Sequence, residues 1–433
     1  MLAAADYVAP HHDRRTGRID AVVLHPLWGT VIFFAVMFGF FQVVFTVAAP
    51  LQDWVARGLG WLGEQVAGHV GNPVLRGLIG DGVIGGVGTV LQFIPQIVLL
   101  FLLIALLENV GYMSRAAFLM DAVMARTGLE GRAFVAMLSS FACAVPGIMA
   151  TRTLPSSRDR IATVISAPLM TCSARLPVYT LLVGLLVAPH TRWWGFSAQG
   201  VTMFLLYLGG GTSALIAAWV FKSTILRSDL LPFTMELPPY RFPSPTAVLV
   251  TMWNAAKIFL RKAGTVILAT SLVLWVLLNL PTRAAETAQL EPAAAASYVM
   301  DHSYAADVGK AIEPVFAPLG FDWRTDVALV GSLSAREVFV STLGQVSAAT
   351  NPEDPGAALA TLTDEHGQRV FTAPTVIALM VYFMYALQCM STVAVMRRET
   401  NSWRWPAFAF GYMFALAWVM AFAARSIAMG LGA

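Results

Sequence analysis

Charged residues are scarce in this chain. Asp, Glu, Lys and Arg together make up 12% of its 433 residues, whereas hydrophobic residues make up 57%. This composition, with a mean hydropathy of +0.68, excludes an ordinary soluble globular domain, which needs far more polar surface. Several apolar runs reach about eighteen residues, the length of a helix that crosses a bilayer. We therefore predict an all-α polytopic membrane protein.

Cysteine is also rare, and the common catalytic motifs are missing. The three cysteines, Cys143, Cys172 and Cys389, lie inside apolar segments, which excludes the disulfide framework of a small secreted domain and favours free thiols. No GxSxG, HExxH or Walker A motif is present, so we do not expect an enzyme. The glycine-rich stretch 80–89 lacks the Lys-Ser/Thr of a phosphate loop and favours tight helix packing.

The placement of the few charges predicts how the chain crosses the membrane. Arginines within 14–18 place the N-terminus in the cytoplasm, and the acid-rich stretch 281–326 is expected outside. Amphipathic stretches at 50–68 and 247–262 are expected to lie along the outer and inner surfaces. Seven full spans are predicted, at 30–48, 90–107, 161–188, 201–221, 264–280, 372–396 and 406–424.

Two further apolar segments have flanks of one kind on both sides. Segment 133–150 lies between basic stretches, so we predict a re-entrant hairpin that enters from the cytoplasm and turns near Cys143 and Pro146. Segment 327–346 lies between acid-leaning stretches and is predicted to enter from the outside.

An internal repeat supports this topology. Residues 128–146 align without gaps on 320–338, with matching glycine, arginine, valine, alanine and serine positions. Each segment is followed by a span with a central cysteine, Cys172 in the first half and Cys389 in the second. Inverted repeats with broken helices are typical of transporters that bind substrate between the repeats.

The polar residues at the predicted breaks indicate a metal path. The candidate ligands are Cys143, Cys172, Cys389, Glu108, Glu337 and Met149. Soft sulfur with hard carboxylate suits a borderline ion such as Fe²⁺ better than Mg²⁺ or Ca²⁺. Ordinary core packing of cysteine and methionine is the alternative.

Proline and arginine inside apolar segments form a second group. The residues that we expect to shape or gate the path are Pro146, Pro177, Arg115, Arg175 and Arg336. Buried arginines need partners, and Glu108 and Glu337 are the obvious counter-ions. Alternatively, Arg115 reaches the interface with its head group.

Several of these segments match a known family. They include LLENVGYMSRAAFLMD, FACAVPGIMATRTL, SSRDRIATVISAPLMTCSARLPVYTLL, MELPPYRFPSP, GSLSAREVFVSTLGQV and QCMSTVAVMRRETNSWRWP. In these segments, which occur in order over most of 20–425, the chain resembles the membrane domain of the FeoB ferrous iron transporters. The resemblance implies two inverted Gate modules, Fe²⁺ uptake across the bacterial inner membrane and control by an N-terminal G domain.

Carried over by position, the resemblance puts Cys143 and Cys172 in motifs proposed to line the iron path. Glu108, Glu337 and Cys389 also stand at family positions. The chain departs from the family pattern at Ala142, Ala144 and Asn109, where glycine, asparagine and an acid are usual. No G domain is recognisable, so residues 1–29 are interpreted as the lead-in from a domain that is truncated or a separate polypeptide.

The predicted organisation follows from these readings. It comprises the lead-in 1–29, a first span with surface helix at 30–78, Gate repeats at 79–222 and 263–433, and a cytoplasmic connector at 223–262. The predicted function is Fe²⁺ transport as the permease part of a GTPase-regulated transporter, with Fe²⁺ as cargo and no permanently bound cofactor. A nucleoside or small-solute transporter and a non-conducting receptor for a G domain are the alternatives. Expected partners are the bilayer, the G domain, a small FeoA-type protein and further copies of the chain, but no nucleic acid.

Overall fold

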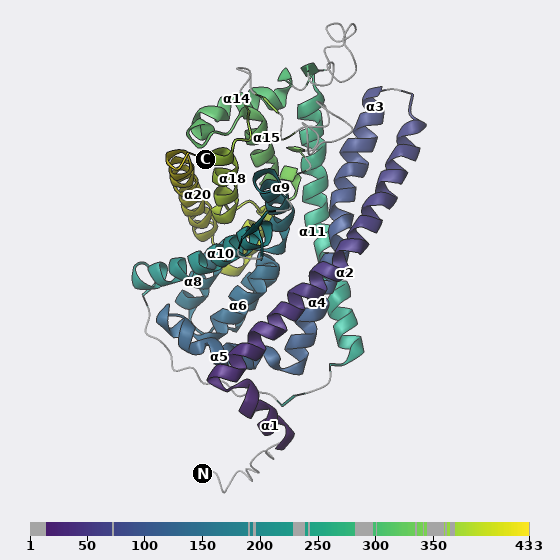
Figure 1. Cartoon of the computed structure of the whole chain (residues 1–433). Coiled ribbons are helices and arrows are strands. Elements are labelled where there is room, and N and C mark those ends of the chain that lie inside the picture. Colours follow the sequence, from purple (N-terminus) through teal and green to yellow (C-terminus); the bar gives the residue numbers. More distant parts are fainter. Residues whose placement is uncertain are drawn as a thin grey trace.

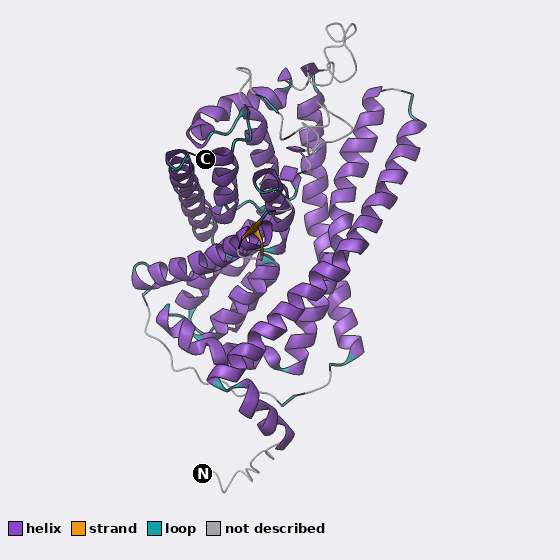
Figure 2. Cartoon of the chain, in the orientation of Figure 1, coloured by secondary structure: helices purple, strands orange, loops and turns teal. Residues whose placement is uncertain are grey.

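The computed structural model describes residues 14–432, except 72, 189–190, 194–195, 228–238, 241–242, 282–297, 300, 334–335, 341, 344–358, 360–361 and 364–368. Helices make up almost all of the described chain (Figure 2). The extended elements in it are an antiparallel pair of two-residue strands, β1 (Arg192–Trp193) and β2 (Phe196–Ser197), and an isolated bridge between Thr363 and Arg369. The predicted all-α class is confirmed.

Several segments are long and apolar enough to cross a membrane. Four do so as they stand: Ser157–Leu186, Ala198–Ser223, Ala373–Thr400 and Arg404–Gly430. Two bent pairs of helices raise the number to six, Thr16–Val23 with Pro26–Phe40 and Ile94–Val110 with Tyr112–Asp121. The described helices thus fit a multi-pass membrane protein, and the expected count of seven spans stays a prediction.

Three long helices lie side by side along one flank of the molecule (Figure 1). They are α2 (Pro26–Gly68), α4 (Gly86–Val110) and α11 (Pro245–Asn279). We predicted separate surface helices at 50–68 and 247–262, and this is wrong, because α2 continues through Pro50 and α11 runs unbroken for 35 residues. An amphipathic stripe also suits a helix that packs one face on a neighbour. Here Gln52 of α2 donates a hydrogen bond to Gln96 of α4, with 2.7 Å between the side-chain atoms.

The glycine-rich stretch lies where α4 meets α11. It spans most of the π-helix η2 (Leu78–Gly85) and the start of α4, directly after the short α3 (Pro73–Gly77). A Cβ atom at Gly77 would lie 3.0 Å from the Trp275 ring, and one at Gly82 would lie 3.4 Å from it. The absence of side chains therefore lets the indole of α11 approach the backbone, and the predicted tight helix packing is confirmed.

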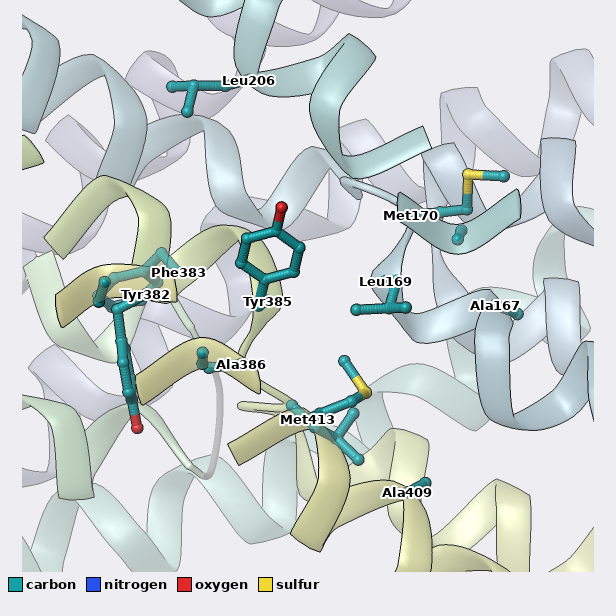
Figure 3. Packing of buried hydrophobic residues seen from close by; sticks show 14 of the residues in the cluster. Ala167, Leu169, Met170, Leu206, Tyr382, Phe383, Tyr385, Ala386, Ala409 and Met413 are labelled. Atoms are coloured by element: carbon teal, nitrogen blue, oxygen red, sulfur yellow. The ribbon is translucent and has the colours of Figure 1, made fainter. Parts of the chain in front are cut away.

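The remaining helices form a more compact body around broken elements. Its first part contains α5 (Tyr112–Arg126), α6 (Gly131–Ala142), α7 (Ala144–Ala150), η3 (Thr151–Thr153), α8 (Ser157–Ser166), α9 (Leu176–Leu186) and α10 (Ala198–Ser223). Its second part contains α14 (Tyr304–Phe316), η6 (Ala317–Leu319), α15 (Trp323–Ser332), α18 (Ala373–Tyr385), α19 (Met390–Thr400) and α20 (Arg404–Gly430). Apolar side chains from both parts share one core, and Figure 3 shows Leu169, Tyr385 and Met413 lying together in it.

The break predicted at Cys143 is confirmed. Cys143 separates α6 from α7 with an extended backbone, φ −155° and ψ 132°. Gly147 of α7 lies so close to Ser140 and Ala136 of α6 that a Cβ atom would collide with both. The short α7 therefore folds back on α6, as the two arms of a hairpin do.

The span expected at 161–188 is interrupted as predicted. After α8 come the 3-10 turn η4 (Ala167–Leu169), a non-helical stretch that includes Cys172, and the 3-10 turn η5 (Ser173–Arg175). In the second half, residues 386–389 are likewise non-helical between α18 and α19. The second expected re-entrant segment, 327–346, begins in α15, and parts of it lie outside the described residues.

A buried acid lies at the start of α15, outside the segments long enough to span. Asp326 is fully buried, and neither of its carboxylate oxygens has a hydrogen-bond partner within the described chain. Burial first, and the nearby carboxylates Asp322 and Glu313 second, raise its pKa to about 8. The pKa of an aspartate in an unfolded chain is near 4, so the folded protein holds this proton over the interval between the two values. Folding stability is therefore lost as pH rises through about 8.

We expect Asp326→Asn to remove this pH dependence, because the amide cannot ionise. Between pH 6 and pH 8.5 the parent chain should lose about 2 kcal/mol of unfolding free energy that the variant keeps. Thermal unfolding in detergent at both pH values measures the difference. Asp307→Asn, in the exposed first turn of α14, is the matched control and should follow the parent chain. Equal pH dependence in Asp326→Asn and the parent would contradict the analysis.

Candidate metal path at the helix breaks

Three cysteines mark three helix breaks, and the structure brings them into one region. Cys143 lies close enough to Cys172, Cys389 and Glu337 for their charges to interact with its thiol. Cys389 in turn lies within range of Cys172 and Arg336. All three thiols are free, and Cys172 is the most buried at 8% exposure. Both halves of the chain therefore contribute to the region, as the predicted repeat requires.

Two of these cysteines occupy the position just before a helix. Cys143 precedes α7, and Cys389 precedes α19, where its backbone is extended with φ −161° and ψ 101°. The Cys389 carbonyl accepts hydrogen bonds from the amides of Thr392 and Val393 at 3.1 and 3.3 Å. The Cys143 sulfur interacts with the backbone amide of Val145, and the Cys389 sulfur interacts with the amide and hydroxyl of Thr392, so each thiol faces the first turn of the helix that follows it. Partial positive charge at a helix start favours an electron-rich group there.

Arg336 joins the two halves at this point. Its Nη1 donates a hydrogen bond to Cys172 Sγ at 3.3 Å, and its Nη2 donates to the Ala386 carbonyl at 3.4 Å. Arg175 Nη2 donates to the same carbonyl at 3.5 Å. Two buried guanidinium groups thus converge on one carbonyl of the non-helical segment before α19.

Arg175 stabilises the break that contains Cys172. Its Nη1 donates to the carbonyls of Leu169 and Met170, both at 3.2 Å, and its Nη2 donates to that of Pro168 at 3.3 Å. These carbonyls would serve a continuous helix, but the break leaves them without amide partners. A planar guanidinium with several N–H groups can satisfy them together.

The expected counter-ions of the arginines are wrong. Arg115 pairs with Asp20 rather than with Glu108, with 2.9 Å between Nε and Oδ1. The Tyr240 ring lies 4.0 Å from the Arg115 guanidinium carbon, and the Tyr240 hydroxyl donates to Asp20 at 3.1 Å. Arg115 is fully buried, so it does not extend to an interface. For Arg175 and Arg336, backbone carbonyls and a sulfur atom replace the expected carboxylate, because the breaks supply acceptors that a sequence pattern does not reveal.

The other predicted site residues lie at different depths. Glu337 is half-buried near Cys143, whereas Glu108 is exposed near the end of α4 and Met149 is 38% exposed on α7. Pro146 and Pro177 stand in the first turns of α7 and α9, where a missing N–H costs least. Both prolines therefore begin the helix that follows a break.

The thiols do not form a closed metal shell in this arrangement. Among the described residues, no three His, Cys, Asp or Glu side chains come close enough together to hold one metal ion. Assignment of the six candidate ligands to a metal therefore remains a prediction. The contact of Arg336 with Cys172 places a fixed positive charge where a cation would bind.

Two ion pairs, one buried and one with an exposed arginine, were not predicted from the sequence. Lys222 of α10 contacts Asp159 of α8, and Glu399 of α19 accepts from Arg152, with 2.5 Å between Oε1 and Nη2. Arg160 Nη2 also donates to the Glu399 carbonyl at 3.0 Å. Arg152 and Arg160 belong to the basic flank after segment 133–150, which predicts topology but not these pairs. Their partners are far along the chain, so no local sequence spacing predicts these pairs.

Two family profiles match the chain. The chain matches the Gate profile, described as nucleoside recognition, over residues 90–186 and 260–403. It also matches the profile of the ferrous iron transport protein B C terminus over residues 203–254. No solved structure matches the chain closely enough to support a comparison.

Curated relatives carry names of iron transporters. A Leptospira interrogans protein (strain Fiocruz L1-130) named Fe(2+) transporter FeoB is 42% identical over 95% of this chain and 59% of its own length. A Porphyromonas gingivalis (strain W83) Fe(2+) transport protein A/Fe(2+) transporter FeoB fusion protein is 37% identical over 94% of this chain and 51% of its own length. An Fe(2+) transporter FeoB of Campylobacter jejuni (strain NCTC 11168) is 35% identical over 95% and 65%. The chain thus spans between 51% and 65% of these relatives.

We expect Arg175→Met to destabilise the protein, because it leaves three buried carbonyls at the Cys172 break without a donor. The expected loss of unfolding free energy is on the order of 3 kcal/mol. Thermal unfolding in detergent measures it, and Arg175→Lys should restore part of the stability. Arg398→Met, on the exposed side of α19, removes the same charge and should leave stability unchanged. Equal stability of Arg175→Met and Arg398→Met would contradict the assigned role.

Proposed function

The chain belongs to the FeoB family of Gate-domain membrane proteins, and on that premise we propose that it carries Fe²⁺ across the bacterial inner membrane into the cytoplasm. The observation that carries this proposal is the meeting of Cys143, Cys172 and Cys389 at three helix breaks from both halves of the chain. Breaks and polar side chains at membrane depth are costly unless they line a path. The names of the relatives support Fe²⁺ as the cargo.

In this proposal the thiols replace water around the ion. Sulfur ligands suit a borderline ion such as Fe²⁺, and the half-buried Glu337 supplies a hard oxygen beside Cys143. An incomplete set of ligands allows the ion to leave again, as conduction requires. The exposed Glu108 and Met149 lie nearer the protein surface, so we assign them to the ends of the path rather than to its centre.

We further propose that a G domain and an FeoA-type protein act on this permease from the cytoplasmic side. The fusion protein of Porphyromonas gingivalis carries both names in one chain, which supports an FeoA-type partner. The lead-in helix α1 (Arg14–Val23) would pass movement of the G domain on to the permease, since its Asp20 forms an ion pair with Arg115 of α5. In this arrangement the N-terminus is cytoplasmic.

A second candidate function has one observation in its favour. The Gate profile carries the description nucleoside recognition. A nucleoside site needs aromatic and amide groups and has no use for thiols, so the cysteine set favours a metal. Uptake of radiolabelled nucleosides by the same vesicles tests this alternative directly.

We expect liposomes that contain the chain to take up Fe²⁺ under reducing conditions, and the double variant Cys143→Ala/Cys172→Ala to reduce the initial rate at least tenfold. Loss of two soft ligands leaves the ion without compensation for its hydration shell. An encapsulated iron-sensitive dye measures the rate. Met124→Leu removes a buried sulfur in the α5 part of the core and should not alter the rate.

Equal rates in the parent chain and the double variant would disprove the cysteine-lined path. Absence of uptake by the parent chain calls for a second arm, with the G domain of a relative and GTP added on the lead-in side. Uptake that appears only then supports a permease held closed until the G domain acts. Continued absence would contradict Fe²⁺ transport by this chain.

A further inference from the structure

Arg336 makes an unusual contact for a cation in a metal path. The guanidinium is 4% exposed and donates to the Cys172 sulfur at 3.3 Å. Its second hydrogen bond goes to the Ala386 carbonyl at 3.4 Å, and its Nε has no hydrogen-bond partner. Within the described residues these are its hydrogen bonds, so no carboxylate holds it by hydrogen bonding. Its hydrogen bonds in the described chain thus go to a sulfur atom and a shared carbonyl, while the carboxylate of the neighbouring Glu337 attracts the charge without a hydrogen bond.

A divalent cation on the Cys172 sulfur would compete with Arg336 for that atom. A guanidinium and a doubly charged ion on one sulfur atom would lie within about 4 Å of each other, where their repulsion is many times thermal energy even with an effective dielectric constant near 20. Arginine stays protonated, so loss of a proton does not relieve this repulsion. Either the guanidinium moves or the ion stays out.

The surroundings of Arg336 allow such a movement. The carbonyl that it uses belongs to residues 386–389, which are non-helical, and Arg175 donates to that carbonyl as well. Release of Arg336 therefore leaves the Ala386 carbonyl with a donor. In the same stretch, the buried Gln388 Oε1 atom has no hydrogen-bond partner among the described residues, so it offers the guanidinium another acceptor. The Met390 amide donates to the Leu333 carbonyl at 3.0 Å, which links this stretch to the turn before Arg336.

We propose that Arg336 is a built-in competitor for the metal: its guanidinium occupies the Cys172 sulfur when the path is empty, and a thiol-binding divalent cation must displace it. The contact joins the first half of the chain to the second, so its release also frees one half from the other. The proposal rests on the proposed function only in taking a divalent cation as the ligand of Cys172.

Binding of Cd²⁺ to the detergent-solubilised chain tests this without transport. Cd²⁺ bound to cysteine sulfur gives a near-ultraviolet charge-transfer band, whose titration gives an apparent Kd. We expect Arg336→Met to bind at least tenfold more tightly than the parent, because the competing charge is gone. In the Arg336→Met background, Cys172→Ala should abolish the gain. The control Arg398→Met removes an exposed charge of α19 and should match the parent.

An unchanged Kd in Arg336→Met, or a gain that persists without Cys172, would overturn the proposal. Arg336→Gln, which keeps a donor for the Ala386 carbonyl, serves the same test should the methionine variant not fold. Absence of the band from every variant would also overturn it. Failure of the proposed function has a different signature, namely Fe²⁺ uptake unaffected by loss of Cys143 and Cys172 while Arg336→Met still tightens Cd²⁺ binding.

Discussion

The structure depends on how broken helices satisfy their backbone in an apolar setting. A helix that stops at membrane depth leaves carbonyls without amide donors, and water is not at hand to replace them. Here the donors are guanidinium groups. Arg175 donates hydrogen bonds to three carbonyls of the Cys172 break and shares the Ala386 carbonyl with Arg336. The breaks can persist because these charges are spread over several acceptors, and the thiols can gather there because the breaks persist.

The same solution explains why the two halves meet as they do. Each break supplies what the other lacks: the stretch before α19 supplies a carbonyl to Arg175, and the turn after α15 supplies Arg336 to Cys172. The apolar core that includes Leu169, Tyr385 and Met413 takes side chains from both halves of the chain (Figure 3). The long helices α2, α4 and α11 lie along one flank (Figure 1). They contribute less to the core, although Cys143 packs near Leu100 of α4.

Prediction from sequence succeeded where local chemistry decides the structure. Proline after cysteine and basic flanks were enough to place the break at Cys143, and the glycine spacing within 80–89 was enough to predict the close approach of helices at Gly82. It failed where an amphipathic stretch has two interpretations: the end of α2 packs on η2 and α4, and α11 continues as one helix instead of starting with a separate surface helix. It also failed for partners far along the chain. Asp20 lies 95 residues from Arg115, and acceptors made by backbone geometry leave no trace in residue type.

The cluster of Asp20, Arg115 and Tyr240 has an evolutionary consequence. Its members come from the lead-in helix, the corner after α4 and the connector before α11. Each member contacts the other two. Loss of Asp20 leaves the buried Arg115 cation without its carboxylate, and loss of Arg115 leaves the Asp20 carboxylate with only the Tyr240 hydroxyl as a partner in this cluster. A lineage can therefore change these three positions only together or through a compensating charge nearby. Among related chains, substitutions at 20, 115 and 240 should occur together. Covariation of the three positions would therefore reveal their contact, even though they form no recognisable local motif.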